Sequence, residues 1–501
     1  MLLLEWRNLP EIVELGTLKS TVSKVEHEEW FAAKLRSADA QIWIVQCDGK
    51  PVGQVRLDPQ AKQEKIISVF LLSNHIGRGF GVDAISQACR MAFALWRDLK
   101  SIRADILAKN ERSRRAFLRA GFAPNVRRQD GEGAFSLFMK RPFVVPHNRL
   151  TYGAKEVAAA SAVVRTGRWA GGQKVAEFES WLQDWSGTKH AVCVGSGLAA
   201  LRLSLAALGV ERGDNVLLPA YSCVALPNAV LANEANPIAA DVESGSWNIG
   251  MDVAKMAVRH DARAAIAVNT FGFPLQEDLL RTSPIDIVED WAHGFRLDAT
   301  GCAPAELISK VAIQSFYATK LLGVGEGGAV LTNSSEVAEY IRQWRDYSDL
   351  MPNARRLNDK MTDISAAIGI AQLERLPLMI RRRAEIAAEY GAMLGAIDAL
   401  REHLDLPLVG SNRVWYRYPI FLKIWDAKQF IDILAQHGVI ADMPVCNWRP
   451  PEIAGKSVAM NAYRGIVSLP LYPTLTLREQ KHVVKGFINT TNFFIKAYGQ
   501  S

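Results

Sequence analysis

A single lysine, Lys320, stands in the stretch SFYATKLLGVGEGG, between a short polar run and a glycine-rich tail. Upstream, Asp290 ends the run IDIVED, so its carboxylate is expected at the carboxyl end of a buried strand. A buried carboxylate is costly unless a cation pairs with it. A lysine that forms a Schiff base and a carboxylate that pairs with a pyridinium nitrogen are the two groups that pyridoxal phosphate (PLP) requires.

A glycine-containing turn upstream could bind the phosphate of that cofactor. The stretch VGSGLAAL, residues 194–201, follows an apolar run and opens a helical pattern. Backbone N–H groups in the first turn of a helix point at a bound anion, and the helix dipole favours negative charge there. Each feature alone has an ordinary alternative, since Asp290 could cap a helix, Lys320 could be solvated and the glycines could form a turn.

A second glycine turn occurs near the amino terminus, in IGRGFGVDAI, residues 76–85. It also follows a strand-like run and opens a helical pattern, which suits a pyrophosphate. The basic stretch NERSRRAFLRAGF, residues 110–122, comes next along the chain. A tight turn and a solvated basic helix are the ordinary alternatives. Glu64 and His75 lie near this candidate cleft and are expected to be surface residues.

The charge of the 501-residue chain is unevenly distributed. Residues 1–145 hold 23 Lys and Arg against 16 Asp and Glu, which is the whole net charge of +7. This excess predicts an anionic partner, either nucleic acid or a phosphate-bearing cofactor. No groove-reading or base-stacking motif accompanies it, so nucleic acid is not expected.

Hydropathy and cysteine spacing exclude other classes of protein. No apolar run reaches 18 residues, so no membrane span is expected. The six cysteines have no metal-ligand spacing, so no metal site is expected. They are interpreted as buried thiols of a reduced, cytoplasmic protein.

The order of secondary-structure signals predicts an α/β chain of three domains, with a break in KRPFVVPHNRLTYG, residues 140–153. Residues 1–145 mix strands and helices. Residues 146–380 alternate short apolar strands with helices, which predicts a mainly parallel sheet with helices on both faces. Residues 381–501 are expected to form a smaller α+β domain.

The N-terminal motifs together resemble the GNAT acyl-CoA N-acetyltransferases. The stretches LLEWRN, EHEEWF and GKPVGQVRLD look like the branch that acetylates amino groups on nucleotide-linked sugars. The resemblance implies a GNAT fold over residues 1–145 and acetyl-CoA as co-substrate. It places the pyrophosphate on Arg78, Gly79, Phe80 and Gly81, and the pantetheine beside Asn110.

Two residues depart from the GNAT pattern. Ile76 replaces the Gln or Arg that opens the loop in the family. Phe117 stands where many members have a tyrosine general acid, and a phenyl ring cannot donate a proton. A non-catalytic domain that only binds CoA or a sugar therefore stays open for this part of the chain.

The remaining motifs resemble the DegT/DnrJ/EryC1/StrS sugar aminotransferases, of fold-type I, over about residues 147–500. The resemblance implies that Lys320 carries PLP and shuttles protons and that Asp290 pairs with the pyridine nitrogen. It places His293 near the ring hydroxyl and Ser315 at the phosphate. The motifs that carry it are TGRWAGGQKVAEFE, GSGLAAL, PAYSCVALPNAV, EDWAHGF, SFYATKLLGVGEGGAV, LNDKMTDISAAIGIAQL and VSLPLYP.

The same resemblance implies further cofactor contacts. The amides of Gly197 and Leu198 hold the phosphate, although Leu198 replaces the usual threonine. Cys223 covers the ring face, where many members have an aromatic side chain. Asn358 reaches the phosphate from a second subunit, which implies a homodimer with two shared sites.

The two resemblances together predict a bifunctional enzyme. A nucleotide-linked keto-deoxy sugar, with a 4-keto-6-deoxyhexose as the expected case, would receive an amine from glutamate. Acetyl-CoA would then acetylate the new amine, for surface glycan biosynthesis. A PLP-dependent sugar dehydratase is the alternative, but such relatives usually have histidine where Lys320 stands.

Overall fold

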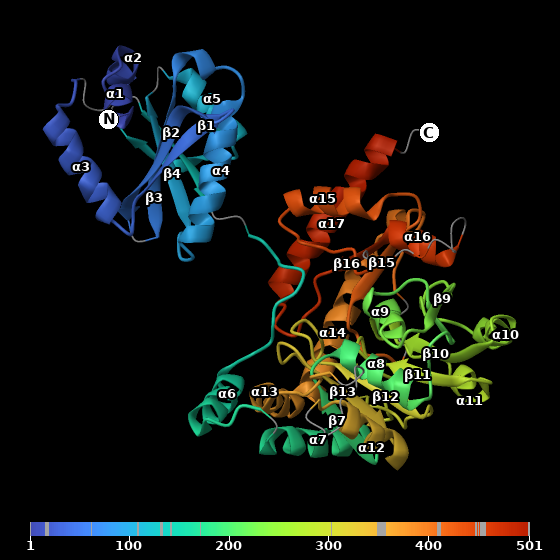
Figure 1. Ribbon diagram of the computed structural model, residues 1–501. Coiled ribbons are helices and arrows are strands. Elements are labelled where there is room, and N and C mark those ends of the chain that lie inside the picture. The colour runs from blue at the N-terminus through green and yellow to red at the C-terminus, as the bar shows by residue number, and fades with distance from the viewer. Residues whose placement is uncertain are drawn as a thin grey trace. The chain divides into compact units, whose positions relative to one another are not determined.

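The computed structural model divides into two compact units, residues 1–143 and 144–501 (Figure 1). The first unit contains a six-stranded sheet, and the second contains a seven-stranded and a three-stranded sheet. The structure describes residues 2–15, 20–61, 63–107, 110–130, 134–140, 143–170, 172–301, 303–347, 357–407, 412–445, 448, 450 and 457–498.

The unit of residues 1–143 is built on a six-stranded sheet in the order β1-β2-β3-β4-β6-β5. The first two strands form a hairpin, and its turn residues Asp48 and Gly49 both have positive φ, as a tight turn between twisted strands requires. The strands are β1 (Gln41–Cys47), β2 (Lys50–Ala61), β3 (Glu64–Leu71), β4 (Ser101–Leu107), β5 (Ala123–Asp130) and β6 (Ala134–Lys140).

The centre of this sheet opens toward one end. The parallel strands β3 and β4 pair only over residues 64–66 and 101–103, while each remains paired with its outer neighbour beyond that point. The two halves of the sheet therefore diverge toward the carboxyl ends of β3 and β4. The helices are α1 (Leu2–Arg7), α2 (Pro10–Leu15), α3 (Lys24–Arg36), α4 (Phe80–Leu95) and α5 (Glu111–Arg119), with the 3-10 turn η1 (Ser73–His75).

The unit of residues 144–501 is built on a seven-stranded sheet in the order β7-β13-β12-β11-β10-β8-β9. All neighbouring strands are parallel except β13, which is antiparallel to both of its neighbours. The strands are β7 (His190–Val194), β8 (Asn215–Pro219), β9 (Asn236–Ala240), β10 (Ala262–Val268), β11 (Asp286–Asp290), β12 (Val311–Ser315) and β13 (Gly328–Thr332).

Helices cover both faces of this sheet (Figure 1), because its strands are apolar on both sides. Helices α8, α9 and α12 pack on one face, and α7, α10, α11 and α13 pack on the other. The helices of this part are α6 (Ala154–Thr166), α7 (Gln173–Ser186), α8 (Gly197–Ala207), α9 (Ala225–Leu231), α10 (Asp252–Arg259), α11 (Glu277–Thr282), α12 (Ser335–Trp344) and α13 (Asp363–Leu373), with the turn η2 (Thr270–Gly272).

The C-terminal part adds a three-stranded antiparallel sheet, β14-β15-β16, and a separate apolar core. Helix α14 begins at Leu376, so Pro377 lies in its first turn, where a missing N–H costs nothing. The elements are α14 (Leu376–Gly395), η3 (Asp398–Leu400), β14 (Leu404–Asp405), β15 (Tyr418–Leu422), α15 (Ala427–Gln436), α16 (Val458–Gly465), β16 (Ile466–Leu469) and α17 (Leu477–Tyr498).

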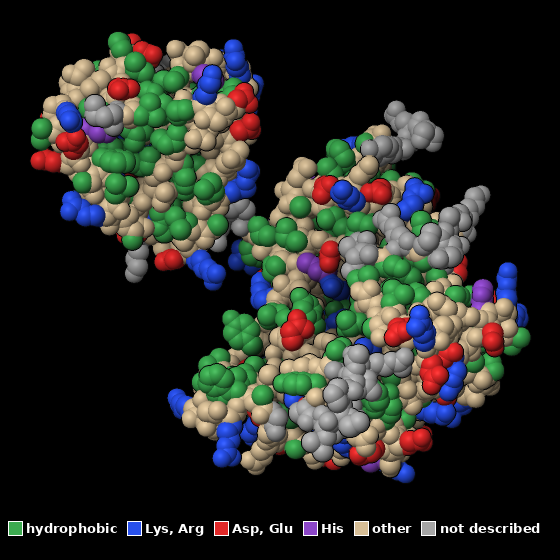
Figure 2. Space-filling model, in the orientation of Figure 1, with side chains coloured by type: hydrophobic (Ala, Val, Ile, Leu, Met, Phe, Trp, Pro, Cys, Tyr) green, Lys and Arg blue, Asp and Glu red, His purple; other side chains and the backbone are tan. Residues whose placement is uncertain are grey.

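Acidic and basic side chains alternate over the visible face of the unit of residues 144–501 (Figure 2), in agreement with its balanced charge. Within the described ranges, no helix is both long and apolar enough to cross a membrane.

Candidate active sites

Lys320 lies in a tight loop that joins β12 to β13. The Ala318 amide donates a hydrogen bond to the Gly325 carbonyl at 2.9 Å, and the Lys320 amide donates to the Tyr317 carbonyl at 2.8 Å. Gly325 has a φ of +99°, which side-chain-bearing residues rarely adopt. The glycine tail thus folds the loop back into β13 and fixes the lysine beside the carboxyl ends of the parallel strands.

Asp290 is the last residue of β11, next to β12 in the sheet, and is only 3% exposed. Its Oδ1 accepts a hydrogen bond from the Ala292 amide at 2.8 Å. Burial raises the pKa of this carboxyl, while the Ala292 amide and the charge of Lys320 lower it. Because Asp290 ends β11 and Lys320 follows the neighbouring strand β12, the predicted carboxylate and lysine lie at the same edge of the sheet, and the carboxylate could accept a cationic partner.

The amino end of α8 meets Ser315, the last residue of β12. Ser196 caps the helix by accepting a hydrogen bond from the Ala199 amide. The Gly197 and Leu198 amides of the same first turn have no intrahelical partner. A Cβ placed on Gly197 would lie only 2.8 Å from the Ser315 Cβ and 3.0 Å from its Oγ. Glycine is thus needed for the close approach, and two amides and a hydroxyl meet where a phosphate could bind.

His293 packs in a stack of rings beside Lys320. Its imidazole lies parallel to the Tyr416 ring, with centroids 4.6 Å apart, and the Phe271 amide donates to its Nδ1 at 3.5 Å. Burial, and then the charges of Lys320 and Arg417, hold the His293 pKa well below its ordinary value. His293 is therefore a neutral imidazole at physiological pH.

Cys223 precedes α9, and its Sγ accepts a hydrogen bond from the Ala225 amide at 3.3 Å. Burial raises the pKa of this thiol, while the hydrogen bond from Ala225 and then the charge of Lys320 lower it. Contrary to the sequence interpretation, the residue is exposed, although enough protein surrounds its thiol to raise the pKa. Cys89 and Cys193 are buried and Cys47 is half-buried, whereas Cys302 and Cys446 lie outside the described residues.

Asn358 is exposed and lies on a segment that runs beside the β7–α8 turn of its own chain. The Gly195 amide donates to the Asp359 carbonyl at 2.6 Å, and the Asp359 carboxylate pairs with Arg202 of α8. The asparagine is thus held near the amino end of α8 with its side chain accessible.

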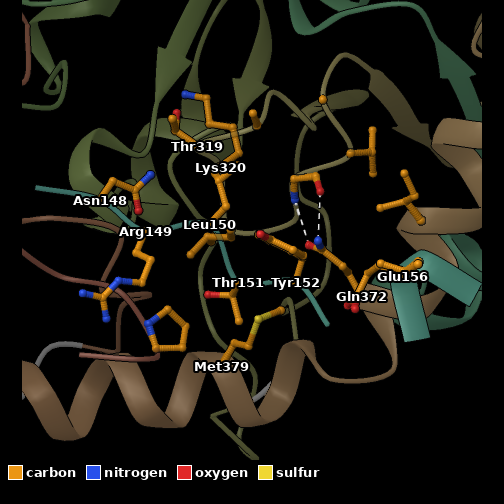
Figure 3. A pocket seen from close by; sticks show the side chains of 18 of the residues that line it. Asn148, Arg149, Leu150, Thr151, Tyr152, Glu156, Thr319, Lys320, Gln372 and Met379 are labelled. Atoms are coloured by element: carbon orange, nitrogen blue, oxygen red, sulfur yellow. Dashed lines mark hydrogen bonds between the residues drawn. The ribbon is translucent and has the colours of Figure 1, made fainter. Parts of the chain in front are cut away.

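A cavity of about 320 Å³ lies next to Lys320 (Figure 3). The chain that enters this unit, residues 148–152, forms one wall of it, and the lysine loop forms another. Gln372 of α13 fastens that loop, since its side chain exchanges hydrogen bonds with the backbone of Gly323 at 2.9 and 3.0 Å.

Sequence reasoning missed a cluster of cationic and aromatic residues beside the lysine. The Lys320 Nζ lies 5.2 Å from the centroid of the Tyr416 ring, and the Arg417 Cζ lies 5.1 Å from the same centroid. Burial raises the Tyr416 pKa, but Lys320, Arg417, a hydrogen bond with Thr319 and Arg383 together lower it to about 8. No local pattern could reveal this cluster, because Tyr416 and Lys320 are far apart in the sequence.

In the N-terminal unit, the predicted glycine loop follows β3, at the end of the sheet where β3 and β4 separate. Gly77 and Gly79 have φ of +87° and +90°, and Gly79 begins α4 without a side-chain cap. The amides of Phe80 and Gly81 therefore have no intrahelical partner, and Arg78 is exposed beside them. This arrangement could bind a pyrophosphate at the amino end of a helix of 16 residues.

Asn110 caps α5 at the same end of the sheet, because it follows β4. Its Oδ1 accepts a hydrogen bond from the Ser113 amide at 3.0 Å. Phe117 is 3% exposed and packs edge-to-face on Phe122, so it is a core residue.

Three further predicted residues of this unit lie as follows. Ile76 is half-buried in the loop before the first turn of α4. His75 contacts Asn74, with its Nδ1 2.6 Å from the amide Oδ1. Glu64 does not lie in the opening, since it is the first residue of β3, at the paired end of the two strands, and it accepts a hydrogen bond from Ser101.

Comparison with known families agrees with both predicted resemblances. Residues 151–487 match the DegT/DnrJ/EryC1/StrS aminotransferase family, and residues 1–123 match an acetyltransferase (GNAT) domain. The chain belongs to the DegT/DnrJ/EryC1/StrS aminotransferase family and carries an N-terminal GNAT domain. The predicted fold class is confirmed.

The curated relatives include enzymes named for nucleotide-linked sugars. The dTDP-3-amino-3,4,6-trideoxy-alpha-D-glucose transaminase of Streptomyces venezuelae is 29% identical over 66% of this chain and 90% of its own length. The UDP-2-acetamido-2-deoxy-3-oxo-D-glucuronate aminotransferase of Pseudomonas aeruginosa is 28% identical over 66% of this chain and 95% of its own length.

Solved structures are also similar to this chain. NtdA of Bacillus subtilis, with bound cofactor PMP, is similar with a TM-score of 0.63 and 25% identity, over 70% of this chain and 86% of its own. DesV of Streptomyces venezuelae, in complex with a ketimine intermediate, has a TM-score of 0.59 and 27% identity, over 67% of this chain and 94% of its own. The chain is a PLP-dependent aminotransferase with an acetyltransferase domain.

Proposed function

We propose that this enzyme transfers an amine from glutamate to a nucleotide-linked keto-deoxy sugar and then acetylates the new amine from acetyl-CoA. One observation carries the proposal: the Lys320 and Asp290 pair stands on the same chain as a GNAT domain whose glycine loop lies at the opening of its sheet. Joining the two activities raises the local concentration of the amino sugar at the second site. The relatives' substrates, named above, support a sugar acceptor.

Within the aminotransferase site, Lys320 would carry PLP and move the proton at the substrate carbon. Asp290 would hold the proton on the pyridine nitrogen, which gives its buried carboxylate a cationic partner. When bound, PLP supplies an electron-withdrawing ring that stabilises negative charge on that carbon. Ser315 and the amides of Gly197 and Leu198 would bind the phosphate.

Two side chains would contact the ring of the cofactor. His293 would lie at the ring hydroxyl, and its neutral state allows its Nε2 to donate while Nδ1 accepts from Phe271. Cys223 would cover one face of the ring, with less area than an aromatic residue provides.

The direct test of this proposal is incubation with PLP, glutamate, acetyl-CoA and a panel of nucleotide-linked 3-keto and 4-keto sugars. Mass spectrometry should detect an amino sugar first and its N-acetyl product later. Formation of the amino sugar without acetylation would leave the N-terminal domain as a binding module. Loss of water without gain of an amine would favour a dehydratase.

We also propose that the active enzyme is a homodimer in which Asn358 contacts the phosphate of the partner's cofactor. The exposed side chain of Asn358 supports this. We expect a Lys320→Ala variant and an Asn358→Ala variant, each weak alone, to regain activity when they are mixed and allowed to exchange subunits. One site of each mixed dimer would then contain both intact residues.

The matched control mixes Lys320→Ala with Asp290→Asn. These two residues lie in one site of one chain, so no mixed dimer can rebuild a complete site. Equal recovery in both mixtures, or full activity of a monomer in light scattering, would exclude the shared site.

Acetyl-CoA binding at the N-terminal loop gives a further prediction. Gly81→Asp should abolish binding, because it places a carboxylate where the pyrophosphate meets the amino end of α4. The backbone of Gly81 is not strained, and an added Cβ would meet only Leu71, at 3.7 Å. The domain should therefore stay folded.

Gly81→Ala is the control and should bind normally in calorimetry with the full-length protein. Wild-type protein that releases no heat with acetyl-CoA, and that leaves a supplied 4-amino-4,6-dideoxyhexose nucleotide unmodified, would show that the domain does not catalyse this transfer.

A further inference from the structure

Two adjoining cavities meet at the lysine loop, and both are lined by cations. The larger one includes Arg149, Lys320 and Arg383, and the smaller one, between His147 and Tyr416, includes Arg383 and Arg417. Asn148 and Thr319 line both. Glu156 also lines the larger cavity, but its carboxylate is paired with Arg375. The remaining positive charges favour an anionic ligand close to the reacting amine.

Two of the three arginines are already bound to carboxylate or carbonyl oxygens. Arg149 forms an ion pair with Glu479 at 2.8 Å. The Arg383 Nη1 donates to three backbone carbonyls, those of Trp415, Tyr416 and Leu471, at 3.0–3.4 Å. Neither guanidinium is thus the obvious partner of an incoming anion.

Arg417 differs from both. Its Nη1 lies 2.8 Å from Nδ1 and 2.7 Å from Nε2 of the His147 imidazole and donates to whichever of the two carries no proton. Within the described part of the chain, no carboxylate pairs with Arg417 and no acceptor meets its other nitrogens. It is half-buried at the cavity wall. A guanidinium in this position can offer further N–H groups to a carboxylate.

The imidazole of His147 acts as a neutral support for this arginine. Burial, and then the charge of Arg417, hold the His147 pKa well below its ordinary value, so the ring can accept the hydrogen bond. His147 also contacts the Ser468 hydroxyl at 3.1 Å. The guanidinium is thereby oriented without being neutralised.

We propose that Arg417 binds a carboxylate of the amino-acid donor, and that His147 positions it for this purpose. Lys320 and Arg417 each lie about 5 Å from the centroid of the Tyr416 ring, so they are at most about 10 Å apart. When the amine of an amino-acid donor takes the place of the lysine amine, the donor's carboxylate lies in the space between Lys320 and Arg417. Arg417 can then bind that carboxylate through a charge-assisted hydrogen bond of about 2.8 Å. The choice of donor rests on the glutamate-dependent function proposed above.

The test measures the first half of the reaction, which needs no sugar. Arg417→Gln, loaded with PLP, is mixed with increasing glutamate, and the loss of the cofactor's absorbance and the release of 2-oxoglutarate are followed. The glutamate concentration for half-maximal rate should rise about 10- to 100-fold, the effect of losing one hydrogen bond between charged groups. Arg417→Lys should recover part of that loss, since it keeps the charge but not the planar group.

A second readout is independent of turnover. Calorimetry with glutarate, a dicarboxylate without an amine, should show weaker binding to Arg417→Gln than to wild type. Arg281→Gln, which removes an exposed arginine of α11 that pairs with Glu277, is the matched control and should behave as wild type in both assays. Circular dichroism spectra and PLP contents that are equal in the Arg417 variants and in wild type would exclude misfolding.

Three outcomes are informative. An unchanged glutamate dependence in Arg417→Gln would overturn the assignment. So would a loss confined to the second half-reaction, which would assign Arg417 to an anionic group of the sugar. If wild type reacts with another amino acid but not with glutamate, the proposed donor is wrong, and the same comparison on that amino acid then decides the role of Arg417.

Discussion

Replacing Lys320 by alanine is expected to abolish transamination while acetylation of a supplied amino sugar continues. The lysine is the amine beside Asp290 and at the edge of the larger cavity, and it would both carry PLP and move the proton. General acid–base catalysis alone contributes about 10²–10⁴-fold, so the combined loss should exceed that range. The fold should persist, because the loop is held by backbone hydrogen bonds that the substitution keeps.

The measurement combines activity with spectroscopy. Wild type incubated with PLP should show a visible band, and borohydride should remove it and fix the cofactor on the peptide that contains Lys320. Lys310→Ala is the matched control, since Lys310 lies just before β12 and forms a surface ion pair with Asp286. A Lys320→Ala variant that transaminates, or labelling of another lysine, would contradict the assignment.

The parts of the site that follow single strands could be predicted from the sequence. Asp290, Ser315 and the Gly197 turn each come directly after, or at the end of, an apolar strand, and parallel strands bring their carboxyl ends to one edge of a sheet. The local patterns therefore predict Asp290 at this edge of the sheet, whereas its role and that of Lys320 followed from the family resemblance.

The contribution of β13 to the site could not be predicted in the same way. The stretch GEGGAV is glycine-rich and has no strand-like pattern of its own, yet Gly328 begins a buried strand that lies between β7 and β12. A Cβ on Gly328 would lie 2.5 Å from the Ser196 carbonyl oxygen, so this glycine serves close packing rather than flexibility. Such a requirement arises from a neighbour distant in sequence, and composition does not reveal it.

The cluster around Tyr416 and Arg417 was even less accessible to prediction from the sequence. Arg417 and His147 are separated by 270 residues, and they meet because the chain entering the second unit runs beside the C-terminal sheet. Charge counting located the excess of the N-terminal unit, but it gave zero for the part of the chain that contains this cationic site. A balanced total charge therefore does not exclude a strongly charged site.

Replacing Asp290 by asparagine should keep PLP bound but slow transamination on the order of 10³-fold. The phosphate contacts proposed for Ser315 and the α8 amides are unchanged by this substitution, and Lys320 remains in place. An amide of the same shape still accepts the hydrogen bond from Ala292, so the strand end should keep its structure. It carries no negative charge to hold a proton on the pyridine nitrogen, so the ring withdraws electrons less well.

Asp286→Asn is the matched control for this prediction, because Asp286 is the first residue of the same strand and pairs at the surface with Lys310. It should leave turnover unchanged. Single-turnover rates with saturating glutamate separate a slower proton transfer from weaker donor binding, which should stay normal in Asp290→Asn because Arg417 is untouched. Near-wild-type turnover in Asp290→Asn would mean that another group holds the ring proton. A variant that loses PLP altogether would instead assign Asp290 to retention of the cofactor, since the proposed phosphate contacts would then be insufficient without the buried charge.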